Sequence, residues 1–256
     1  MPRTPMIAGN WKMNMSADGT RDLIAGIRAG GVDSVTNVDK VVCPPFVYLE
    51  AAREACAGSS IKVGAQNMHW EQKGAFTGEV SPLMLAEEQL AELVIIGHSE
   101  RRQYFCETDE TVNKKLKAAL NVGLTPIVCV GESGEQRQAG QTDEVLKRQV
   151  RGAFEGVETP PTVVVAYEPV WAIGTGVAAT PDDAQQAIRL IRRELASIIG
   201  ESTASAVRIL YGGSATPTNI ASFVSQADVD GGLVGGASLV ADSFVAMVKA
   251  VAALGA

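Results

Sequence analysis

Two side chains suited to proton transfer follow short apolar stretches of this sequence. His98 comes just after the apolar run 93–96, and Glu168 directly follows the apolar run 163–167. A carboxylate held at a strand end, beside a pocket that can be closed to water, is a candidate general base. A neutral imidazole can donate a hydrogen bond to a carbonyl oxygen, above all where a helix N-terminus lowers its pKa. The alternatives are a core histidine bonded to the backbone and a salt-bridged or solvated glutamate.

Glycine pairs follow two further apolar runs and could bind an anion. Gly212 and Gly213 precede Ser214, while Gly235 and Gly236 follow the last apolar run. Glycine lets the backbone approach an anion closely and aim its N–H groups at it, and a helix N-terminus after each loop adds favourable charge. One such pair alone is usually a tight turn. Two pairs at consecutive strand ends, one with a hydroxyl beside it, predict a phosphate site.

The segment after Glu168 predicts a lid. It comprises Pro169, Val170, Trp171, Ala172, Ile173, Gly174, Thr175 and Gly176. The apolar side chains of this expected loop need something to bury against, and closure over a ligand provides it, with the glycines as hinges. The glycines also imitate the G-x-G-x-x-A fingerprint of dinucleotide binding. We reject that interpretation because they lie several residues beyond the apolar run, and the next helix begins only at Thr180.

Eight short apolar runs recur along the chain and must position these residues. They are rich in Val and Ile and lack regular polar alternation, which is typical of parallel strands buried on both faces. They cover residues 6–8, 38–43, 61–65, 93–96, 126–130, 163–167, 207–211 and 229–234. Helical patterns separate the runs, and capping residues predict helix starts at Thr180–Pro181, Ser81–Pro82, Thr216–Pro217 and Thr108.

Eight strand–helix units in 256 residues favour one closed (β/α)8 barrel, an α/β fold, as a single domain over residues 1–256. The alternative is a doubly wound open sheet with an extra subdomain, although such sheets typically have five or six strands. In a barrel the chemistry lies at the C-terminal ends of the strands, and all the candidate residues fall there. The connection 67–81 has no periodicity, and a loop of that length is usually functional.

The composition excludes several classes of protein. The chain has 22 Lys plus Arg against 29 Asp plus Glu and a net charge of −7, without a dense basic run, so no nucleic-acid partner is expected. An acidic protein that binds an anion must concentrate positive charge locally, and Lys12 is the candidate. No apolar stretch is long enough to span a membrane, and no signal peptide is recognisable. Four cysteines without a CxxC pair fit a reducing, cytoplasmic setting and no metal site.

Distinctive motifs recur at the expected strand ends. They read AGNWKMN (8–14), GAQN (64–67), GAFTGEVSP (74–82), GHSERR (97–102), PIVCVGE (126–132), AYEPVWAIGTG (166–176), YGGS (211–214) and GLVGGASL (232–239). In this order, and over essentially the whole chain, they resemble the triosephosphate isomerase family. The motif AYEPVWAIGTG alone is highly specific for that family.

The resemblance implies a TIM barrel and the interconversion of dihydroxyacetone phosphate and D-glyceraldehyde 3-phosphate through an enediol(ate), in glycolysis and gluconeogenesis. No cofactor and no metal are implied. By resemblance, Glu168 moves the carbon-bound proton, His98 is the neutral electrophile at the carbonyl oxygens, and Lys12 stabilises developing negative charge. Asn10 helps position the oxygens, and Glu100 is expected beside Lys12.

The resemblance also assigns the ligand-binding and subunit contacts. The substrate is a small phosphorylated triose, which residues 169–176 cover. Besides Asn10 and Lys12, the residues expected at its phosphate are Gly174, Ser214, Gly235 and Gly236. The family forms homodimers in which Thr77 enters the partner subunit, and neither nucleic acid nor a membrane is an expected partner.

Two other functions compete with this one. An aldolase on the same fold would need a Schiff-base lysine inside the barrel, but the lysines in the apolar runs, Lys40 and Lys62, lie in the N-terminal halves of theirs. A catalytically silent phosphate-binding barrel with a scaffolding role is the second alternative. The joint presence of the acid, base and lysine candidates disfavours it.

Overall fold

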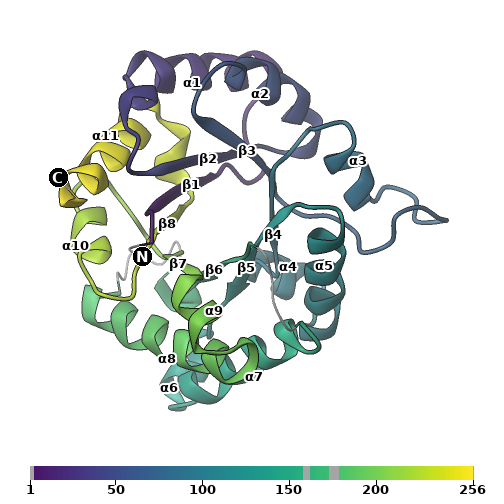
Figure 1. Ribbon diagram of the computed structural model, residues 1–256, viewed down its shortest axis with the longest axis vertical. Coiled ribbons are helices and arrows are strands. Elements are labelled where there is room, and N and C mark those ends of the chain that lie inside the picture. Colours follow the sequence, from purple (N-terminus) through teal and green to yellow (C-terminus); the bar gives the residue numbers. More distant parts are fainter. Residues whose placement is uncertain (1–2, 158–161, 173–178, 256) are drawn as a thin grey trace.

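The computed structural model describes residues 3–157, 162–172 and 179–255. Eight parallel strands form a closed barrel in which each strand pairs with its neighbours in sequence and β8 pairs with β1 (Figure 1). They are β1 (Met6–Asn10), β2 (Asp39–Cys43), β3 (Ile61–Ala65), β4 (Leu93–Ile96), β5 (Thr125–Val130), β6 (Val164–Tyr167), β7 (Arg208–Tyr211) and β8 (Gly231–Val234). The predicted (β/α)8 barrel is confirmed, and the doubly wound sheet was the wrong alternative.

The strands bury both of their faces, which explains their apolar runs. Successive side chains of a strand point to opposite sides. In β1, Met6 and Ala8 pack inside the barrel against side chains such as Leu233 of β8. Ile7, between them, packs outward in the larger layer between strands and helices, as does Val42 of β2. The barrel is therefore a filled core, and a ligand can bind only at its rim.

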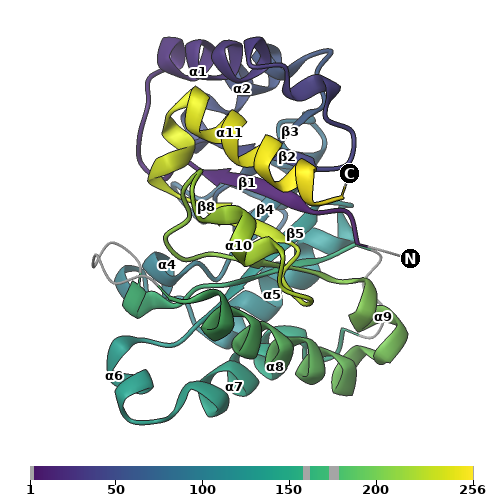
Figure 2. The ribbon, with the colours of Figure 1, turned by 90° about the vertical axis from the view of Figure 1, so that its left-hand side faces the viewer.

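Helices surround the barrel. The α-helices are α1 (Ala17–Ala29), α2 (Leu49–Cys56), α3 (Pro82–Ala86), α4 (Ser99–Tyr104), α5 (Asp109–Asn121), α6 (Gly134–Gln138), α7 (Thr142–Phe154), α8 (Pro181–Ile199), α9 (Glu201–Ala206), α10 (Ile220–Val224) and α11 (Ala241–Ala252). Short 3-10 helices are η1 (Val32–Ser34), η2 (Phe46–Tyr48), η3 (Val170–Ala172), η4 (Gly236–Leu239) and η5 (Ala253–Gly255). Helices α10 and α11 cover the seam where β8 meets β1 (Figure 2).

Three of the four predicted helix starts are confirmed by their caps. The Thr180 side chain accepts a hydrogen bond from the Asp183 N–H and the Asp183 carboxylate accepts one from the Thr180 N–H, so a capping box begins α8. The Ser81 hydroxyl accepts from the Met84 N–H at the start of α3, and Thr108 forms a capping box with Thr111 at the start of α5. Proline at the first position of α8 fits because that N–H has no helical partner.

The start predicted at Thr216–Pro217 was wrong. Helix α10 begins only at Ile220, with Asn219 as its N-cap. The Asn219 side chain instead accepts a hydrogen bond from the Thr216 N–H at 2.7 Å and donates one to the Ser214 carbonyl at 3.2 Å. These bonds close a turn over residues 216–219, and asparagine commonly stabilises such turns through its side chain.

The connection between β3 and α3 projects from the ring of helices, at the right of Figure 1. His69 lies within it, buried, with its ring 4.1 Å from the Trp70 ring and 4.3 Å from the Phe76 ring, centroid to centroid. The aromatic residues therefore pack locally within the loop. Thr77, near the tip, is exposed.

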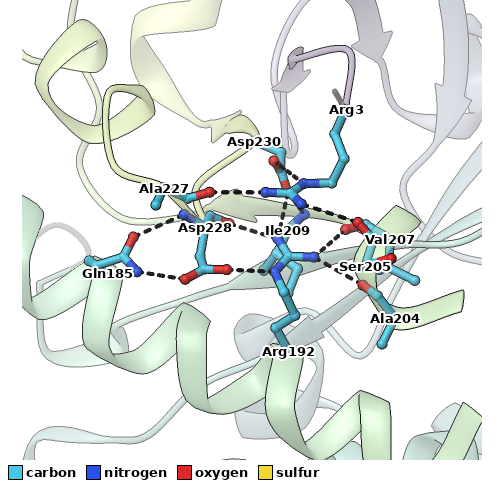
Figure 3. A network of polar contacts seen from close by, with 10 residues as sticks. All are labelled: Arg3, Gln185, Arg192, Ala204, Ser205, Val207, Ile209, Ala227, Asp228 and Asp230. Carbon is cyan, nitrogen blue, oxygen red and sulfur yellow. Dashed lines mark hydrogen bonds and ion pairs between the residues drawn. The ribbon is translucent and has the colours of Figure 1, made fainter. Parts of the chain in front are cut away.

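A network of charges lies at the N-terminal ends of β1, β7 and β8 (Figure 3). Arg192 of α8 donates to the Asp228 and Asp230 carboxylates, at 2.8 Å each. Asp230 also accepts from the Arg3 side chain at 2.6 Å and from the Ile209 N–H at 2.8 Å. The network thereby joins the start of the chain, the beginnings of β7 and β8, and helix α8.

Within the described ranges, no helix combines the length and the apolar character needed to span a bilayer.

Candidate active site

The C-terminal ends of the strands surround a cavity of about 350 Å³. It is lined by Asn10, Lys12, His98, Glu168, residues 212–216, Leu233 and residues 235–237. The structure thus brings together the expected base, imidazole, amide and lysine with Ser214, Gly235 and Gly236. Glu100 contacts this group through Lys12. Gly174 and the other lid positions Ile173, Thr175 and Gly176 lie outside the described residues.

Glu168 is the carboxylate of this cavity and is almost fully buried. Its N–H donates to the Val130 carbonyl at 2.8 Å, which holds it against the end of β5. One carboxylate oxygen accepts from the Ser99 N–H at 2.9 Å, and the other accepts from the Ser99 hydroxyl at 3.0 Å. Burial raises the pKa of Glu168, but the His98 ring and the Ser99 hydrogen bonds more than offset this and lower it. The carboxylate is therefore ionised at neutral pH, as a general base must be.

His98 lies between β4 and α4, where it is the N-cap of the helix. Its Nδ1 accepts a hydrogen bond from the Glu100 N–H at 3.2 Å, so the ring proton is placed on Nε2. Nε2 lies 3.0 Å from a Glu168 oxygen. Burial lowers the pKa of His98, but the adjacent Glu168 carboxylate outweighs burial and raises it. The neutral imidazole is thus favoured once Glu168 moves away or takes up a proton.

Among the described residues that line the cavity, Lys12 is the only Lys or Arg. Its backbone has φ = +53°, a left-handed conformation that is uncommon outside glycine. The Asn10 side chain accepts from its N–H at 3.1 Å, and the Gln66 side chain donates to its carbonyl at 2.9 Å. Its Nζ lies 2.6 Å from a Glu100 carboxylate oxygen. These contacts fix the backbone on both sides and aim the ammonium group at the cavity.

The glycine loop that follows β8 leaves open space beside the Lys12 side chain. A Cβ atom added to Gly236 would meet nothing within 4 Å, and one added to Gly235 would lie 3.6 Å from the Cε of Lys12. The lysine side chain therefore runs alongside the loop that follows β8. Ser214, after β7, donates its hydroxyl to the Ala172 carbonyl at 2.8 Å.

The described part of the expected lid is anchored to the end of β5. Trp171 Nε1 donates to a Glu132 oxygen at 2.9 Å, and the Tyr167 hydroxyl donates to the same oxygen at 3.1 Å. The Arg137 guanidinium lies over the Trp171 ring, with its Cζ 4.1 Å from the centroid.

Sequence reasoning assigned no role to Ser99, Glu132 or Arg137. Ser99 follows His98 directly and Glu132 follows β5, so their positions at strand ends were a usable signal. Arg137 carries no such signal, because it lies within α6 and reaches Trp171 only through the fold.

A larger cavity of about 710 Å³ shares Glu168 with the first and extends toward α5 and α7. Both arginine side chains that line it are already paired: Arg102 donates to the Gly97 carbonyl and to Asp109, and Arg148 donates to Asp109. The smaller cavity holds the lysine, the imidazole and the glycine loops, so it is the candidate active site despite its size. Over the described ranges, no three His, Cys, Asp or Glu side chains come together as a metal site.

The sequence profile of triosephosphate isomerase matches residues 5–251 of this chain. The chain belongs to the triosephosphate isomerase family. It is 55% identical over 249 residues to the triosephosphate isomerase of Moorella thermoacetica, covering 96% of this chain and 98% of that protein. It is 53% identical over 249 residues to that of Clostridium perfringens, covering 96% and 99%. For Lactobacillus delbrueckii subsp. bulgaricus the identity is 48% over 251 residues, covering 97% and 99%.

The part of the chain that matches the triosephosphate isomerase profile contains the whole candidate site, from Asn10 to Gly236. The exposed loop with Thr77 lies within it as well. The recognition of the triosephosphate isomerase family from the sequence motifs is confirmed.

Proposed function

We propose that this protein interconverts dihydroxyacetone phosphate and D-glyceraldehyde 3-phosphate by moving a proton between adjacent carbons, in glycolysis and gluconeogenesis. The observation that supports this most directly is the buried, ionised Glu168 carboxylate 3.0 Å from the Nε2 of His98, in a cavity that also holds Lys12. A base, a proton donor and a cation around one small volume are what enolisation of a phosphorylated triose needs.

The reaction moves one proton from a carbon to its neighbour and a second proton between the two oxygens. The Glu168 carboxylate gives up its Ser99 hydrogen bonds and takes a proton from the carbon beside the carbonyl. The electrons of that C–H bond form the carbon–carbon double bond, and the carbonyl oxygen becomes the enediolate oxygen. The Nε2–H of His98 and the Lys12 ammonium stabilise this oxygen, with Asn10 helping to position it. A proton then moves from the hydroxyl oxygen to the former carbonyl oxygen through the Nε2 of His98, which gives up one proton and takes up another. Glu168 returns its proton to the neighbouring carbon, the double-bond electrons form the new C–H bond, and the other oxygen becomes the carbonyl. Neither a cofactor nor a metal is required.

The phosphate group lies at the glycine loops in this proposal. Backbone N–H groups of Ser214, Gly235 and Gly236 bind it, together with Gly174 of the lid, and Lys12 attracts it. In a protein with a net charge of −7, this local positive charge and the oriented amides are what draw in an anion. Residues 169–176 close over the bound ligand and exclude water, which strengthens every polar interaction within the site.

The protein acts as a homodimer of single-domain barrels, with Thr77 of each subunit entering the other. The loop that carries Thr77 projects from the barrel, and large apolar side chains are exposed on it and elsewhere: Met13 is 95% and Phe76 43% exposed. Contact with a second copy of the chain would bury such side chains. All four cysteines are free, which is consistent with the cytoplasm as the compartment.

The test is a coupled assay of the purified protein with glyceraldehyde 3-phosphate, with Glu168→Gln as the comparison. The amide cannot accept the carbon-bound proton, so turnover is expected to fall by at least about 10²-fold. Binding of a phosphate analogue should persist, because the glycine loops are unchanged. Near-normal turnover of Glu168→Gln, or no turnover by the unaltered protein, would overturn the proposal. The latter result with analogue binding intact would instead support a silent phosphate-binding barrel.

A further inference from the structure

Helix η3, two residues after Glu168, is held at two points. At its end, the Ser214 hydroxyl donates to the Ala172 carbonyl at 2.8 Å. In its middle, Trp171 donates to Glu132 at 2.9 Å and lies beneath the Arg137 guanidinium, whose Cζ is 4.1 Å from the ring centroid. These two attachments respond differently to a ligand.

A phosphorylated ligand competes for the first attachment. Ser214 lines the cavity, and its hydroxyl has one proton to donate, so it can serve either Ala172 or a phosphate oxygen. Glu168 must likewise leave the Ser99 N–H and hydroxyl before it can face a substrate carbon. Ligand binding therefore draws η3 and the base away from the arrangement described above.

The ligand has no access to the second attachment, because Glu132 and Arg137 do not line the cavity. Glu132 is fully buried, and its Oε2 has no hydrogen-bond partner within the described residues. Over the same ranges, its one ion pair is with Arg137, whose guanidinium nitrogen lies 3.5 Å from Oε1. Arg137 thus contacts both Trp171 and the Glu132 carboxylate that anchors it.

Arg137 also contacts the chain beyond residues 173–178. It donates to the Asp183 carboxylate at 2.7 Å, and Asp183 forms the capping box of α8 with Thr180. One side chain therefore connects η3 to the start of α8.

We propose that Arg137 is a positioning residue that restrains η3 in the ligand-free arrangement, acting through Trp171 while Asp183 holds its guanidinium. It thereby sets how readily Glu168 leaves Ser99. This inference rests on the proposed function, since it assumes a phosphorylated ligand in the cavity. A ligand that binds only the released arrangement binds less tightly when another contact stabilises the restrained arrangement. Removing the restraint should therefore tighten binding.

The experiment measures the dissociation constant of glycerol 3-phosphate, which lacks a carbonyl and cannot isomerise, by titration calorimetry. Arg137→Met keeps the length of the side chain but removes the charge and the stacked plane. Its dissociation constant is expected to fall about 2- to 30-fold, the range that a cation–π contact supplies. Arg151→Met is the matched control: Arg151 also pairs with a carboxylate of α8, Glu194, but does not contact η3, so binding should not change.

Two further variants distinguish restraint through Trp171 from a general structural effect. In a Trp171→Leu background, Arg137→Met should cause no further change in the dissociation constant. Arg137→Lys keeps a charge near Glu132 and Asp183 without the planar group, so its dissociation constant should lie between those of Arg137→Met and the unaltered protein. If Arg137→Met does not fold, Arg137→Lys alone provides the test.

Unchanged or weaker binding by Arg137→Met, or the same shift in the Trp171→Leu background, would overturn the inference. If the unaltered protein neither isomerises glyceraldehyde 3-phosphate nor binds glycerol 3-phosphate, the proposed function fails instead. If it does both and Arg137→Met binds as tightly as the unaltered protein, only the role of Arg137 is lost.

Discussion

Glu168 and His98 set each other's protonation. The carboxylate raises the pKa of the imidazole, and the imidazole lowers the pKa of the carboxylate, with burial opposing both shifts. The Ser99 hydroxyl and N–H also stabilise the ionised carboxylate. The site therefore keeps its base ionised while no substrate is present. It gives the imidazole its neutral form when the base moves away or takes up a proton.

This coupling predicts how His98 titrates. In Glu168→Gln the amide carries no charge, while burial of the ring still disfavours the imidazolium, so the pKa of His98 is expected to fall. Proton NMR can follow the ring directly, because the chain has two histidines. His69 is the internal control: its Nδ1 accepts from the Glu71 N–H, away from the cavity. A His98 titration that is the same in both proteins would contradict the coupling.

At the scale of elements, the positions of the proposed catalytic groups depend on how closely the strand ends approach one another. Gly131, just after β5, faces the backbone of Glu168, just after β6. A Cβ atom on Gly131 would lie 1.8 Å from the Glu168 carbonyl oxygen. Glycine is therefore required there by the contact between two backbones, since neither strand end can move without distorting the barrel.

Gly131→Ala is therefore expected to displace Glu168. A misplacement of about 1 Å can reduce the rate by about 10²-fold, so kcat/KM should fall by that order. Gly134→Ala is the matched control, since an added Cβ there would lie 3.6 Å from the Trp171 Cβ, an ordinary contact. Steady-state kinetics of both variants, with thermal unfolding alongside, make the comparison. Equal kcat/KM for the two would show that the close approach does not position the base.

At the scale of the whole molecule, function and stability lie at opposite ends of the barrel. The cavity is at the C-terminal ends of the strands, whereas the network of Arg3, Arg192, Asp228 and Asp230 lies at their N-terminal ends (Figure 3). The side chain of Arg192 is 12% exposed and that of Asp230 is 6% exposed. The network therefore contributes to the closure of the barrel and not to the reaction.

Arg192→Met should destabilise the protein without impairing catalysis. Two largely buried carboxylates each lose an arginine partner, and breaking a buried ion pair costs about 3 to 5 kcal/mol. The free energy of unfolding, measured by urea denaturation, should fall by that amount while kcat stays the same. Arg193→Met, one position along on the exposed side of α8, should change stability by about 0.5 kcal/mol or less. Equal effects of the two substitutions would show that the network contributes little.

The proposed subunit contact can be tested separately. Thr77→Glu places a charge on the projecting loop, where the homodimer would bury it without a partner, so the dimer should dissociate at higher protein concentrations. Sedimentation velocity over a dilution series measures this. Thr162→Glu adds the same charge at an exposed position before β6 and should have no effect. An unchanged profile for Thr77→Glu would refute the assigned contact.

The sequence alone determined the barrel, its strands and the candidate base, imidazole and ammonium group of the site. Eight doubly buried strands require short apolar runs without polar alternation, and these runs are visible without any structure. The catalytic candidates were found because a barrel places its chemistry just after each strand. At Thr216 the capping residue begins a single turn, in which the Asn219 and Ile220 N–H groups donate to the Thr216 carbonyl, and regular helix follows only from Ile220. Local capping rules do not show how far a helix continues beyond its first turn.

Only the tertiary structure decided how these groups are paired. Ser99 and Glu168 are 69 positions apart in the chain, and Lys12 and Glu100 are 88 positions apart. Nothing in the local sequence shows that Ser99 meets Glu168, and the pairing of Lys12 with Glu100 was expected only from the family resemblance. The restraint of Trp171 by Arg137 and the approach of Gly131 to Glu168 are likewise products of strand register and barrel closure. The physical reason is that the sequence pattern records which residues are buried, whereas hydrogen bonds and pKa shifts depend on distances of a few ångströms that only the closed barrel establishes.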